Sequence, residues 1–565
     1  METPLTPLEF ARRARSLYRD RLAVVDGELR LTYEQFFARC DRWSNVLASW
    51  GVVKGDRVAY IAPNTHAQLE AFYAVPQLGA VLVPLNYRLT ADDFAYMIEH
   101  SGSNVVCVHS DYLAIADTLR ARCQAVTHWV ALEGTHAGFA DYEALIANAP
   151  PDVARAEVSE RDLLTINYTS GTTSRPKGVM ITHRNAWVNS VGTLLHHPMT
   201  PAEVYLWTLP MFHANGWTFT WTITAVGGVH VCLRKVAPPE IFERIKTEKV
   251  TALCCAPTVL IGIANAPTDP GLPRGVRVLT AGAAPAATTI EKIEGQLGWT
   301  VTQVYGLTET APFITVCEPR AEHAAMSLAE RAVIKARQGV ELMTSGELRI
   351  VDEEMKDVPH DGATIGEIVV RGNVVMAGYY NDPVATELAF AGGYFHTGDS
   401  AVVHPDGYAE IRDRMKDVII SGGENISPVD IESVLSLHPA VDEVAVAGLK
   451  DERWGQRVVA FIKRKGDVDA AALEAYCKGS DLVNFKRPRE YVFVAEIPKS
   501  PVGKILRRKL VAGEYAVETA RALLPPSGEG WDGGHRAAMA TPVEEARPSL
   551  AALAPSLTLP QGGRE

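Results

Sequence analysis

The sequence predicts an α/β protein with a large N-terminal domain and a small α+β domain near the C-terminus. In the first half, short apolar runs alternate with helical patterns: Asp56–Ala62 reads as a strand and Thr65–Leu78 as a helix. Such alternation predicts parallel sheets covered by helices. After about Ser345 the pattern changes to β-rich pieces broken by Gly and Asp, and beyond Arg412 to a compact mixture of strands and helices.

The remaining elements of the first half are expected in a regular order. A strand at Ala80–Leu85 precedes a helix that begins at Thr90, where two aspartates in the first turn favour the positive end of the helix dipole. A strand at Asn104–His109 follows, and Ser110 is expected to cap the next helix. Further strands are predicted at 250–256, 276–281 and 301–305.

The second half predicts a β-rich subdomain and then the small domain. The expected strands and helices are 347–351, 367–371, a helix from about 428, strands 443–447 and 457–463, a helix 470–478 and a strand 491–495. The predicted division is an N-terminal domain 1–411, a hinge 412–417, a C-terminal domain 418–512 and a tail 513–565. The tail is rich in Ala, Pro, Gly and Ser, which predicts disorder.

Composition limits the class of protein. The 565 residues carry a net charge of −12, which disfavours nucleic-acid partners because phosphate backbones require a basic face. The eight cysteines lack metal-ligand or disulfide spacing, and no secretory signal is visible, so reduced thiols in the cytoplasm are expected. Tyr205–Leu233 contains no Asp, Glu, Lys or Arg, but its glycines and polar residues favour a buried helix and strand over a membrane span.

A phosphate-binding loop is the strongest motif. The segment Tyr168–Gly178 (YTSGTTSRPKG) follows the apolar run Leu163–Ile166 and is dominated by hydroxyl residues and Gly. Backbone N–H and side-chain O–H groups of such a loop converge on phosphate oxygens, and Lys177 adds a cation. The spacing differs from the Walker A pattern, because Pro176 stands where Gly is required.

This loop resembles the signature of the adenylate-forming superfamily, which includes acyl-CoA synthetases, luciferases and the adenylation domains of peptide synthetases. Ser174 departs from the usual Gly of that signature. Further segments match in the family's order, and the matches extend from about Leu31 to Leu510: LPMFH at 209–213, YGLTE at 305–309, TGD at 397–399, RDRMKD at 412–417, GGENI at 422–426 and PKSPVGK at 498–504.

The resemblance implies an ATP site. ATP-binding residues are then Thr169, Ser170, Gly171, Thr172, Thr173, Lys177, Tyr305, Asp399 and Arg414. Tyr305 offers a ring to adenine and Asp399 accepts the ribose hydroxyls. Thr308 adds an O–H to the phosphates, and Glu309 is a hard oxygen ligand for Mg²⁺.

The resemblance also implies two half-reactions. Lys504 bridges the acid and the α-phosphate during adenylation, which is electrostatic catalysis. Lys416 is the hinge about which the small, mobile domain turns, and Gly422 and Gly423 let the pantetheine arm of CoA pass close to the backbone. The expected substrates are ATP, CoA and a carboxylic acid, with Mg²⁺.

The acid pocket is expected around His213, Trp217 and Gly282, with Trp217 as an aromatic gate. His213 stands where peptide-synthetase domains carry an Asp that holds the substrate amine, so an amino acid is disfavoured. A core histidine is an equal alternative for His213, and Trp217 is alternatively a core residue.

The predicted enzyme is therefore an AMP-forming acyl-CoA ligase, with a medium-chain fatty acid as the preferred substrate. Aryl, short branched and long-chain acids are alternatives within the same reaction. Alternatives from other classes are a luciferase-like oxygenase, a carrier-protein loading enzyme and a non-catalytic binding module. Both a monomer and a homodimer are consistent with the sequence.

Overall fold

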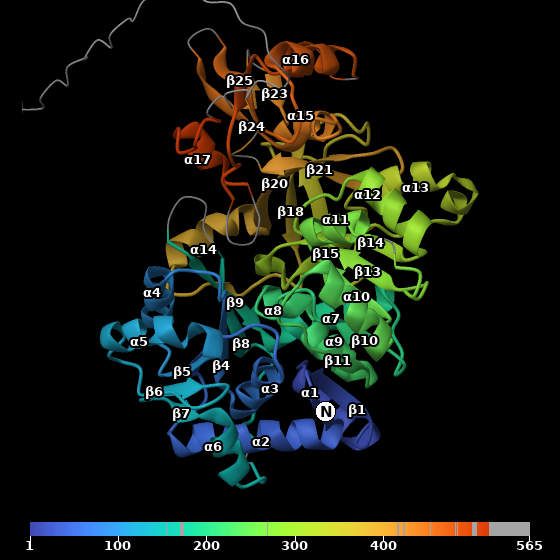
Figure 1. Ribbon diagram of the computed structural model, residues 1–565. Coiled ribbons are helices and arrows are strands. Elements are labelled where there is room, and N and C mark those ends of the chain that lie inside the picture. Colours follow the sequence, from blue (N-terminus) through green and yellow to red (C-terminus); the bar gives the residue numbers. More distant parts are fainter. Residues whose placement is uncertain are drawn as a thin grey trace, which may run out of the picture. The chain divides into compact units, whose positions relative to one another are not determined.

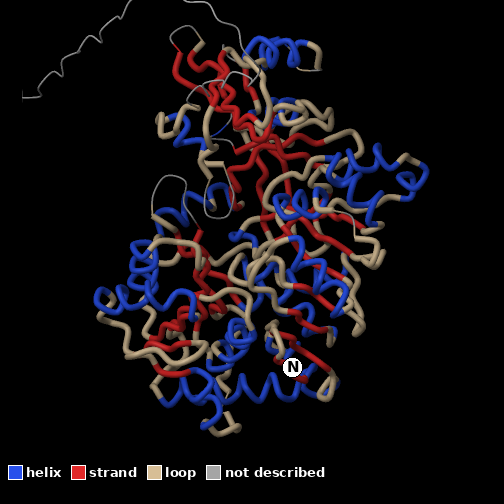
Figure 2. The backbone as a smooth tube through the Cα atoms, viewed as in Figure 1, coloured by secondary structure: helices blue, strands red, loops and turns tan. Residues whose placement is uncertain are grey.

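The computed structural model describes residues 1–518 except 154, 170–174, 268, 415–416, 418, 422–423, 452–453, 481, 483 and 500–504. Within this part the α/β prediction is confirmed (Figure 1). Helices and strands alternate along the chain through the N-terminal half (Figure 2).

The first sheet carries the phosphate-loop strands near one edge. Its order is β19 (Gly378–Tyr379), β9 (Lys177–Thr182), β8 (Leu163–Thr169), β4 (Val81–Leu85), β3 (Arg57–Ile61), β5 (Val105–Val108), β6 (His128–Ala131) and β7 (Ala140–Asp141). The strands from β8 to β7 run parallel, whereas β9 is antiparallel to both β8 and β19. The antiparallel hairpin β8–β9 therefore presents the loop between its two strands.

The second sheet has a parallel centre and antiparallel edges. Its order is β16 (Val340–Glu341), β15 (Phe313–Val316), β14 (Thr300–Gly306), β13 (Arg277–Thr280), β12 (Ala252–Cys255), β10 (Val204–Leu206), β11 (Val229–Val231), β1 (Leu22–Asp26) and β2 (Leu29–Thr32). Because β12, β13 and β14 are parallel, the residues that follow them meet at one edge of the sheet.

Helices cover both sheets and share a core between them. The shared core contains α2 (Tyr33–Ser49), α3 (His66–Ala74), α7 (His183–His196) and α9 (Phe219–Val226), while α4 (Ala91–Ser101) and α5 (Leu113–Arg122) cover the outer face of the first sheet. Helices α10 (Pro238–Glu248), α11 (Pro257–Asn265) and α12 (Ala287–Lys292) cover the outer face of the second.

The alternation of strand side chains explains this layering. In β3, Val58 and Tyr60 face the shared core, whereas Ala59 and Ile61 face the outer helices. All four residues are buried, as expected for a parallel strand covered on both sides.

The β-rich subdomain is an antiparallel sheet of order β17 (Glu347–Val351), β18 (Gly366–Arg371), β20 (Phe395–Val403) and β21 (Ala409–Arg414). Strand β21 pairs with β20 as far as Arg414, opposite Asp399. The first three residues of the predicted hinge, 412–414, are thus part of a strand.

The small domain is built on β23 (Glu424–Ile426), β22 (Ile419–Ser421), β25 (Gly455–Arg464), β24 (Val441–Asp451) and β26 (Glu490–Phe493). Helices α15 (Pro428–Leu435) and α16 (Ala470–Lys478) pack on one face, and α17 (Arg507–Val511) on the other. The chain continues past the predicted boundary at 512, because Glu518 N donates to Phe493 O at 3.0 Å and Val517 bridges Val494. These contacts attach residues 517 and 518 to the small domain, and the predicted division into domains remains a prediction.

One predicted cap is wrong. Thr90 caps α4 as expected, with a reciprocal bond to Asp93, but Ser110 does not cap α5. A short 3₁₀ turn, Ser110–Tyr112, stands between strand and helix, and His109 caps that turn through its ring nitrogen. An extra turn of this kind leaves no signal in hydrophobic spacing.

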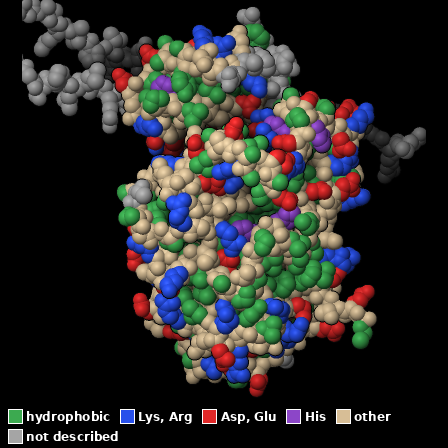
Figure 3. Space-filling view, turned by 90° about the vertical axis from the view of Figure 1, so that its right-hand side faces the viewer, with side chains coloured by type: hydrophobic (Ala, Val, Ile, Leu, Met, Phe, Trp, Pro, Cys, Tyr) green, Lys and Arg blue, Asp and Glu red, His purple; other side chains and the backbone are tan. Residues whose placement is uncertain are grey.

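The uncharged segment 205–233 forms strand β10, a short turn, helix α9 and strand β11, as predicted. Among the described helices none is long and apolar enough to cross a membrane. All eight cysteines are buried, and none of them forms a disulfide in the structure. On the face in Figure 3, basic and acidic side chains are interspersed and do not gather by sign.

Candidate active site

The phosphate loop connects β8 to β9, and its two ends are adjacent because Thr169 and Lys177 are paired across the hairpin. The Lys177 ammonium lies 4.6 Å from the centre of the Tyr379 ring. Burial raises the pKa of Tyr168, which precedes the loop, so its phenol stays protonated at neutral pH. The strands therefore place the two ends of the loop side by side, and Lys177 supplies a cation at one of these ends.

Tyr305 and Asp399 meet although 94 residues separate them. The Tyr305 hydroxyl donates to Asp399 Oδ2 at 2.7 Å, and both residues are more than nine-tenths buried. Asp399 is oriented from its own strand, because its N–H donates to Thr397 Oγ1 at 3.1 Å and the Thr397 hydroxyl donates to Ile368 O at 2.7 Å. The residues predicted for adenine and for ribose thus form one unit.

Glu309 lies on a 3₁₀ turn, η4 (Thr308–Thr310), directly after β14. The Tyr379 hydroxyl donates to Glu309 Oε1 at 3.1 Å, and Met376 N–H donates to Glu309 O at 2.8 Å. Thr308 and Glu309 are half-buried. The turn therefore presents a hydroxyl and a carboxylate beside the strand that carries Tyr305.

The surroundings of Glu309 can be compared with the number of protein ligands that a magnesium ion requires. The described residues contain no group of three or more His, Cys, Asp or Glu side chains placed to hold a metal. Mg²⁺ keeps several waters and is commonly bound by one or two carboxylates together with substrate phosphates. A single half-buried carboxylate beside a phosphate loop meets that requirement.

Trp217 stands at the end of a left-handed turn. Five consecutive residues, Ala214–Thr218, have φ between 38° and 70°. Each non-glycine residue in this conformation costs about 1–2 kcal/mol. At Gly216 (φ 57°) a Cβ would lie 2.5 Å from the Trp207 ring, so glycine is required there by close packing as well as by conformation.

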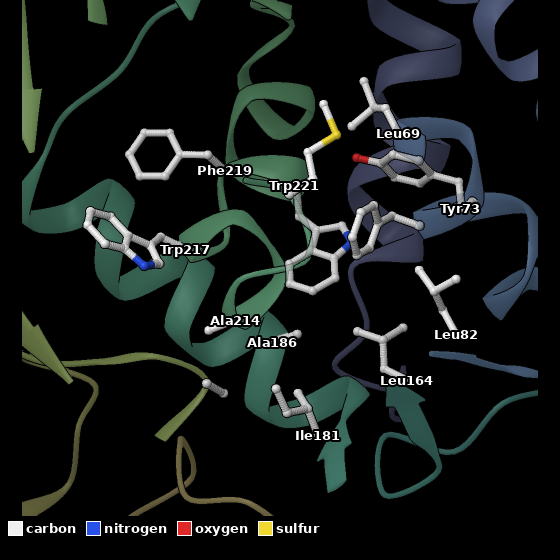
Figure 4. Packing of buried hydrophobic residues seen from close by; sticks show 14 of the residues in the cluster. Leu69, Tyr73, Leu82, Leu164, Ile181, Ala186, Ala214, Trp217, Phe219 and Trp221 are labelled. Carbon is white, nitrogen blue, oxygen red and sulfur yellow. The ribbon is translucent and has the colours of Figure 1, made fainter. Parts of the chain in front are cut away.

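The turn places Trp217 in the shared core. The Trp217 side chain is 4% exposed and its ring lies 5.5 Å from that of Phe313 in an edge-to-face arrangement. Figure 4 shows the Trp217 ring on the opposite side of this cluster from Tyr73 and Leu82. Phe313 is paired with Gly306, the residue after Tyr305. The predicted gate is therefore buried and lies close to the predicted nucleotide site.

His213 precedes the turn and is half-buried. Its N–H donates to Pro210 O at 3.1 Å, and its carbonyl accepts from Gly216 N at 3.0 Å. Gly282 follows β13 with φ 93°, and a Cβ there would have no neighbour within 4 Å. Because Thr280 is paired with Gln303, Gly282 lies at the same sheet edge as Tyr305. Gly282 is exposed at this edge.

Two matches with family models cover most of this arrangement. The model described as AMP-binding enzyme matches residues 10–380, and the model described as AMP-binding enzyme C-terminal domain matches residues 430–504. The chain belongs to the AMP-binding enzyme family.

Relatives and solved structures agree with this membership. An acetate/butyrate–CoA ligase of Arabidopsis thaliana is 40% identical over 538 residues, which is 90% of this chain and 94% of the relative. A trans-cinnamate:CoA ligase of Petunia hybrida is 38% identical over 90% of this chain and 93% of its own length. ATP-bound MatB from Rhodopseudomonas palustris superimposes with a TM-score of 0.79 at 27% identity, covering 90% of this chain and 99% of that one. The protein is accordingly an ATP-dependent CoA ligase of this family.

Sequence reasoning missed the asparagines that hold the acid-pocket segment of this AMP-binding enzyme. Asn64 binds the segment from both sides: its Nδ2 donates to Trp207 O at 2.7 Å and to Leu209 O at 3.0 Å, and its Oδ1 accepts from Met211 N at 2.8 Å. Asn64 is 3% exposed. Buried amides with all their polar atoms engaged fix a local conformation.

Two further asparagines, Asn167 and Asn215, connect the segment that carries His213 and Trp217 to the strand before the phosphate loop. Asn167, two residues before Thr169, donates to Phe212 O at 3.1 Å and to Asn215 Oδ1 at 3.0 Å. Asn215 in turn donates to Thr165 Oγ1 at 2.8 Å. The available sequence signal was Asn167 itself, a polar residue directly after the apolar run Leu163–Ile166.

Several predicted site residues lie outside the described residues: Ser170, Gly171, Thr172, Thr173, Lys416, Gly422, Gly423 and Lys504. Arg414 is described only by its backbone, as the pairing partner of Asp399. Their roles remain predictions. The described members of the predicted ATP site that the structure links are the pair Tyr305–Asp399 and the contacts of Lys177 and Glu309 with Tyr379.

Proposed function

We propose that this AMP-binding enzyme is a Mg²⁺-dependent CoA ligase for short-chain or small aromatic carboxylic acids. The acid and ATP form acyl-AMP and pyrophosphate, and the CoA thiol then displaces AMP to form the thioester. The observation that carries the choice of acid is the buried pair Trp217–Phe313.

The position of this pair limits the acyl chain. The reacting carboxylate must lie beside the α-phosphate, and therefore near Tyr305 and Thr308. Phe313 is paired with the residue after Tyr305, so the Trp217 indole stands within a short distance of that carboxylate position. Two large packed rings leave room for few methylene groups before the acyl chain meets them.

The named relatives support the same choice. The names of these enzymes give acetate, butyrate and trans-cinnamate as their substrates. The medium-chain acid expected from the sequence is therefore replaced here by the short-chain and aryl alternatives. The cytoplasmic location and a homodimer remain sequence-based expectations.

The nucleotide site assigns a role to each described side chain. Tyr305 stacks on adenine and, through its hydroxyl, orients Asp399, whose carboxylate accepts the ribose hydroxyls. Lys177 and Thr308 bind phosphate oxygens. Glu309 would hold Mg²⁺, which neutralises phosphate charge when bound. Lys504 then stabilises charge that develops between the acid and the α-phosphate.

A substrate series tests the proposal. Purified enzyme is supplied with ATP, Mg²⁺ and acetate, butyrate, 2-methylpropanoate, hexanoate, octanoate, benzoate or trans-cinnamate, and AMP and acyl-CoA are measured with and without CoA. Each buried methylene is worth about 0.8 kcal/mol, so kcat/KM should rise about fourfold per CH₂ and then fall once the chain meets the rings. We expect the fall before octanoate.

One outcome of this series and two added measurements, of light and of transfer to a carrier protein, would contradict the proposal. A maximum at octanoate or beyond restores the medium-chain assignment. Light emission in the presence of oxygen indicates a luciferase-like reaction. Acyl transfer to a phosphopantetheine carrier protein without transfer to free CoA indicates a loading enzyme.

A further inference from the structure

Tyr379 lies between two groups of opposite charge that the proposed reaction needs. Its hydroxyl donates to Glu309 Oε1 at 3.1 Å, and its ring face receives the Lys177 ammonium at 4.6 Å from the ring centre. Lys177 comes from the base of the phosphate loop and Glu309 from the turn after β14. The two come from different sheets, and a third segment supplies the side chain that contacts both.

The backbone around Tyr379 binds the same two elements. Tyr379 is paired with Val179 on β9, and Tyr380 N–H donates to Gly178 O at 2.7 Å. Three residues earlier, Met376 N–H donates to Glu309 O at 2.8 Å. The segment 376–380 therefore connects the phosphate hairpin to the Glu309 turn, and the tyrosine ring is fixed from both sides.

A second clamp holds this segment from its C-terminal side. Tyr379 N–H donates to Thr386 Oγ1 at 2.9 Å, and the Thr386 hydroxyl donates to Asp382 O at 2.8 Å. Asp382 caps helix α14 (Pro383–Ala389). The backbone at Tyr379 is thus also held by hydrogen bonds that do not involve Lys177 or Glu309.

We propose that Tyr379 is a positioning residue that holds the Glu309 carboxylate for Mg²⁺ and keeps the Lys177 ammonium apart from it. This inference rests on the proposed function, in which Glu309 binds the metal and Lys177 binds phosphate. Between these two described residues the structure shows no ion pair, although both contact the same ring.

The two contacts have different physical effects. A carboxylate has two oxygens and about four lone-pair directions, so a phenol on Oε1 orients the group and leaves capacity for a metal ion. The ring face attracts the ammonium electrostatically without donating or accepting a proton. A lysine that instead reached Glu309 would neutralise the carboxylate and compete with the metal for its oxygens.

Substitutions that separate the two contacts test the inference. Tyr379→Phe keeps the ring and removes the hydroxyl, whereas Tyr379→Leu removes both. Tyr380→Phe is the matched control, because it makes the same change at the neighbouring residue, which packs beside Tyr168 and His100. ATP binding is measured by calorimetry across a Mg²⁺ series, together with adenylation kinetics and thermal unfolding.

We expect the hydroxyl to act on the metal and the ring to act on the nucleotide. Tyr379→Phe should raise the Mg²⁺ concentration for half-maximal ATP binding about tenfold, with little change in the KM for the acid. Tyr379→Leu should show the same shift and a further loss of ATP affinity of about threefold or more. Tyr380→Phe should match the wild type in both measurements.

Several results overturn the inference. If Tyr379→Phe binds ATP with the wild-type Mg²⁺ dependence, the hydroxyl does not position the metal ligand, whether or not the unfolding temperature falls. If Tyr379→Leu matches Tyr379→Phe, the ring does not position Lys177. Failure of the proposed function looks different: the wild type itself would then show no Mg²⁺-dependent ATP binding or would activate no acid in the series.

Discussion

The Tyr305 hydroxyl donates a hydrogen bond of 2.7 Å to Asp399 Oδ2, which joins the end of one strand to the middle of a strand in a different sheet. Tyr305 belongs to β14 of the second sheet and Asp399 to β20 of the β-rich subdomain. A phenol that orients a buried carboxylate prepares it to accept further hydrogen bonds in one geometry. Adenine and ribose recognition are therefore expected to depend on each other.

The first prediction concerns this pair. Asp399→Ala should raise the KM for ATP by about 10- to 150-fold, since a hydrogen bond to a charged group is worth about 1.5–3 kcal/mol. Tyr305→Phe keeps the ring for adenine and should give a smaller increase. The double variant should lose less than the two single effects combined, because both act through one carboxylate. Fully additive losses, measured by steady-state ATP titrations, would contradict the coupling.

The second prediction separates the half-reactions. Lys504→Ala should slow acyl-AMP formation by about 100- to 1000-fold, which is typical for loss of one transition-state charge stabiliser. Thioester formation from supplied acyl-AMP should change little. Lys499→Ala is the control, because Lys499 lies in the same basic stretch and is engaged with Glu443 at 2.7 Å. Equal loss of both half-reactions would argue against a role confined to adenylation.

The third prediction concerns acyl-chain length. Trp217→Ala removes the indole from the Trp217–Phe313 pair and should extend activity to hexanoate and octanoate while flattening the preference among acids. The change also costs about 3–5 kcal/mol of stability if the indole is only a core residue. Thermal unfolding is therefore measured with the kinetic series. A folded variant that keeps the wild-type chain-length profile would exclude Trp217 as the limit of the pocket.

The fourth prediction uses the left-handed turn. Trp217 has φ 52°, a conformation that glycine adopts without penalty and alanine does not. Trp217→Gly should therefore be more stable than Trp217→Ala by about 1 kcal/mol, although it removes one more carbon. Chemical denaturation of the two variants gives the difference. A more stable alanine variant would mean that the turn changes its conformation when the indole is removed.

The fifth prediction concerns pH and a charge network away from the nucleotide site. Burial lowers the pKa of His66, but hydrogen bonds to Asp26 at 2.7 Å and Glu143 at 3.1 Å outweigh it and raise the pKa to about 9 from 6.5. The charged histidine therefore stabilises the fold fully below pH 6.5, and this contribution is lost as the pH rises through about 9.

A pKa raised from 6.5 to about 9 corresponds to about 3 kcal/mol of stability. The free energy of unfolding should fall by about that amount between pH 6.5 and pH 9.5. His66→Gln should abolish most of this fall, because glutamine carries no titrating proton. If the free energy of unfolding falls equally with pH in the wild type and in His66→Gln, His66 does not cause the pH dependence of stability.

The order of the chemical motifs allowed the reaction class to be predicted without a structure. The phosphate loop, the Tyr305–Glu309 segment and Asp399 are short runs in which the functional atoms lie within a few residues of each other. The short apolar runs in 56–62 and 80–85 likewise identified strands, because a continuous apolar run of this length is a local signal of a buried strand. The turn at 110–112 left none, and the contacts of residues 517 and 518 with the small domain depend on a strand pairing that composition does not reveal.

The sequence by itself determined the ligase class, and it predicted the order of the domains and the groups that bind ATP, because each depends on residues close together in the chain. Only the tertiary structure decided how those groups are held. The Tyr305–Asp399 bond, the Tyr379 contacts with Lys177 and Glu309, and the Asn167–Asn215 bond join residues brought together by sheet packing. The left-handed turn that includes Trp217 also depends on tertiary structure. An unfavourable backbone conformation persists only where the surrounding packing and hydrogen bonds outweigh its free-energy cost, and these contacts cannot be read from the local sequence.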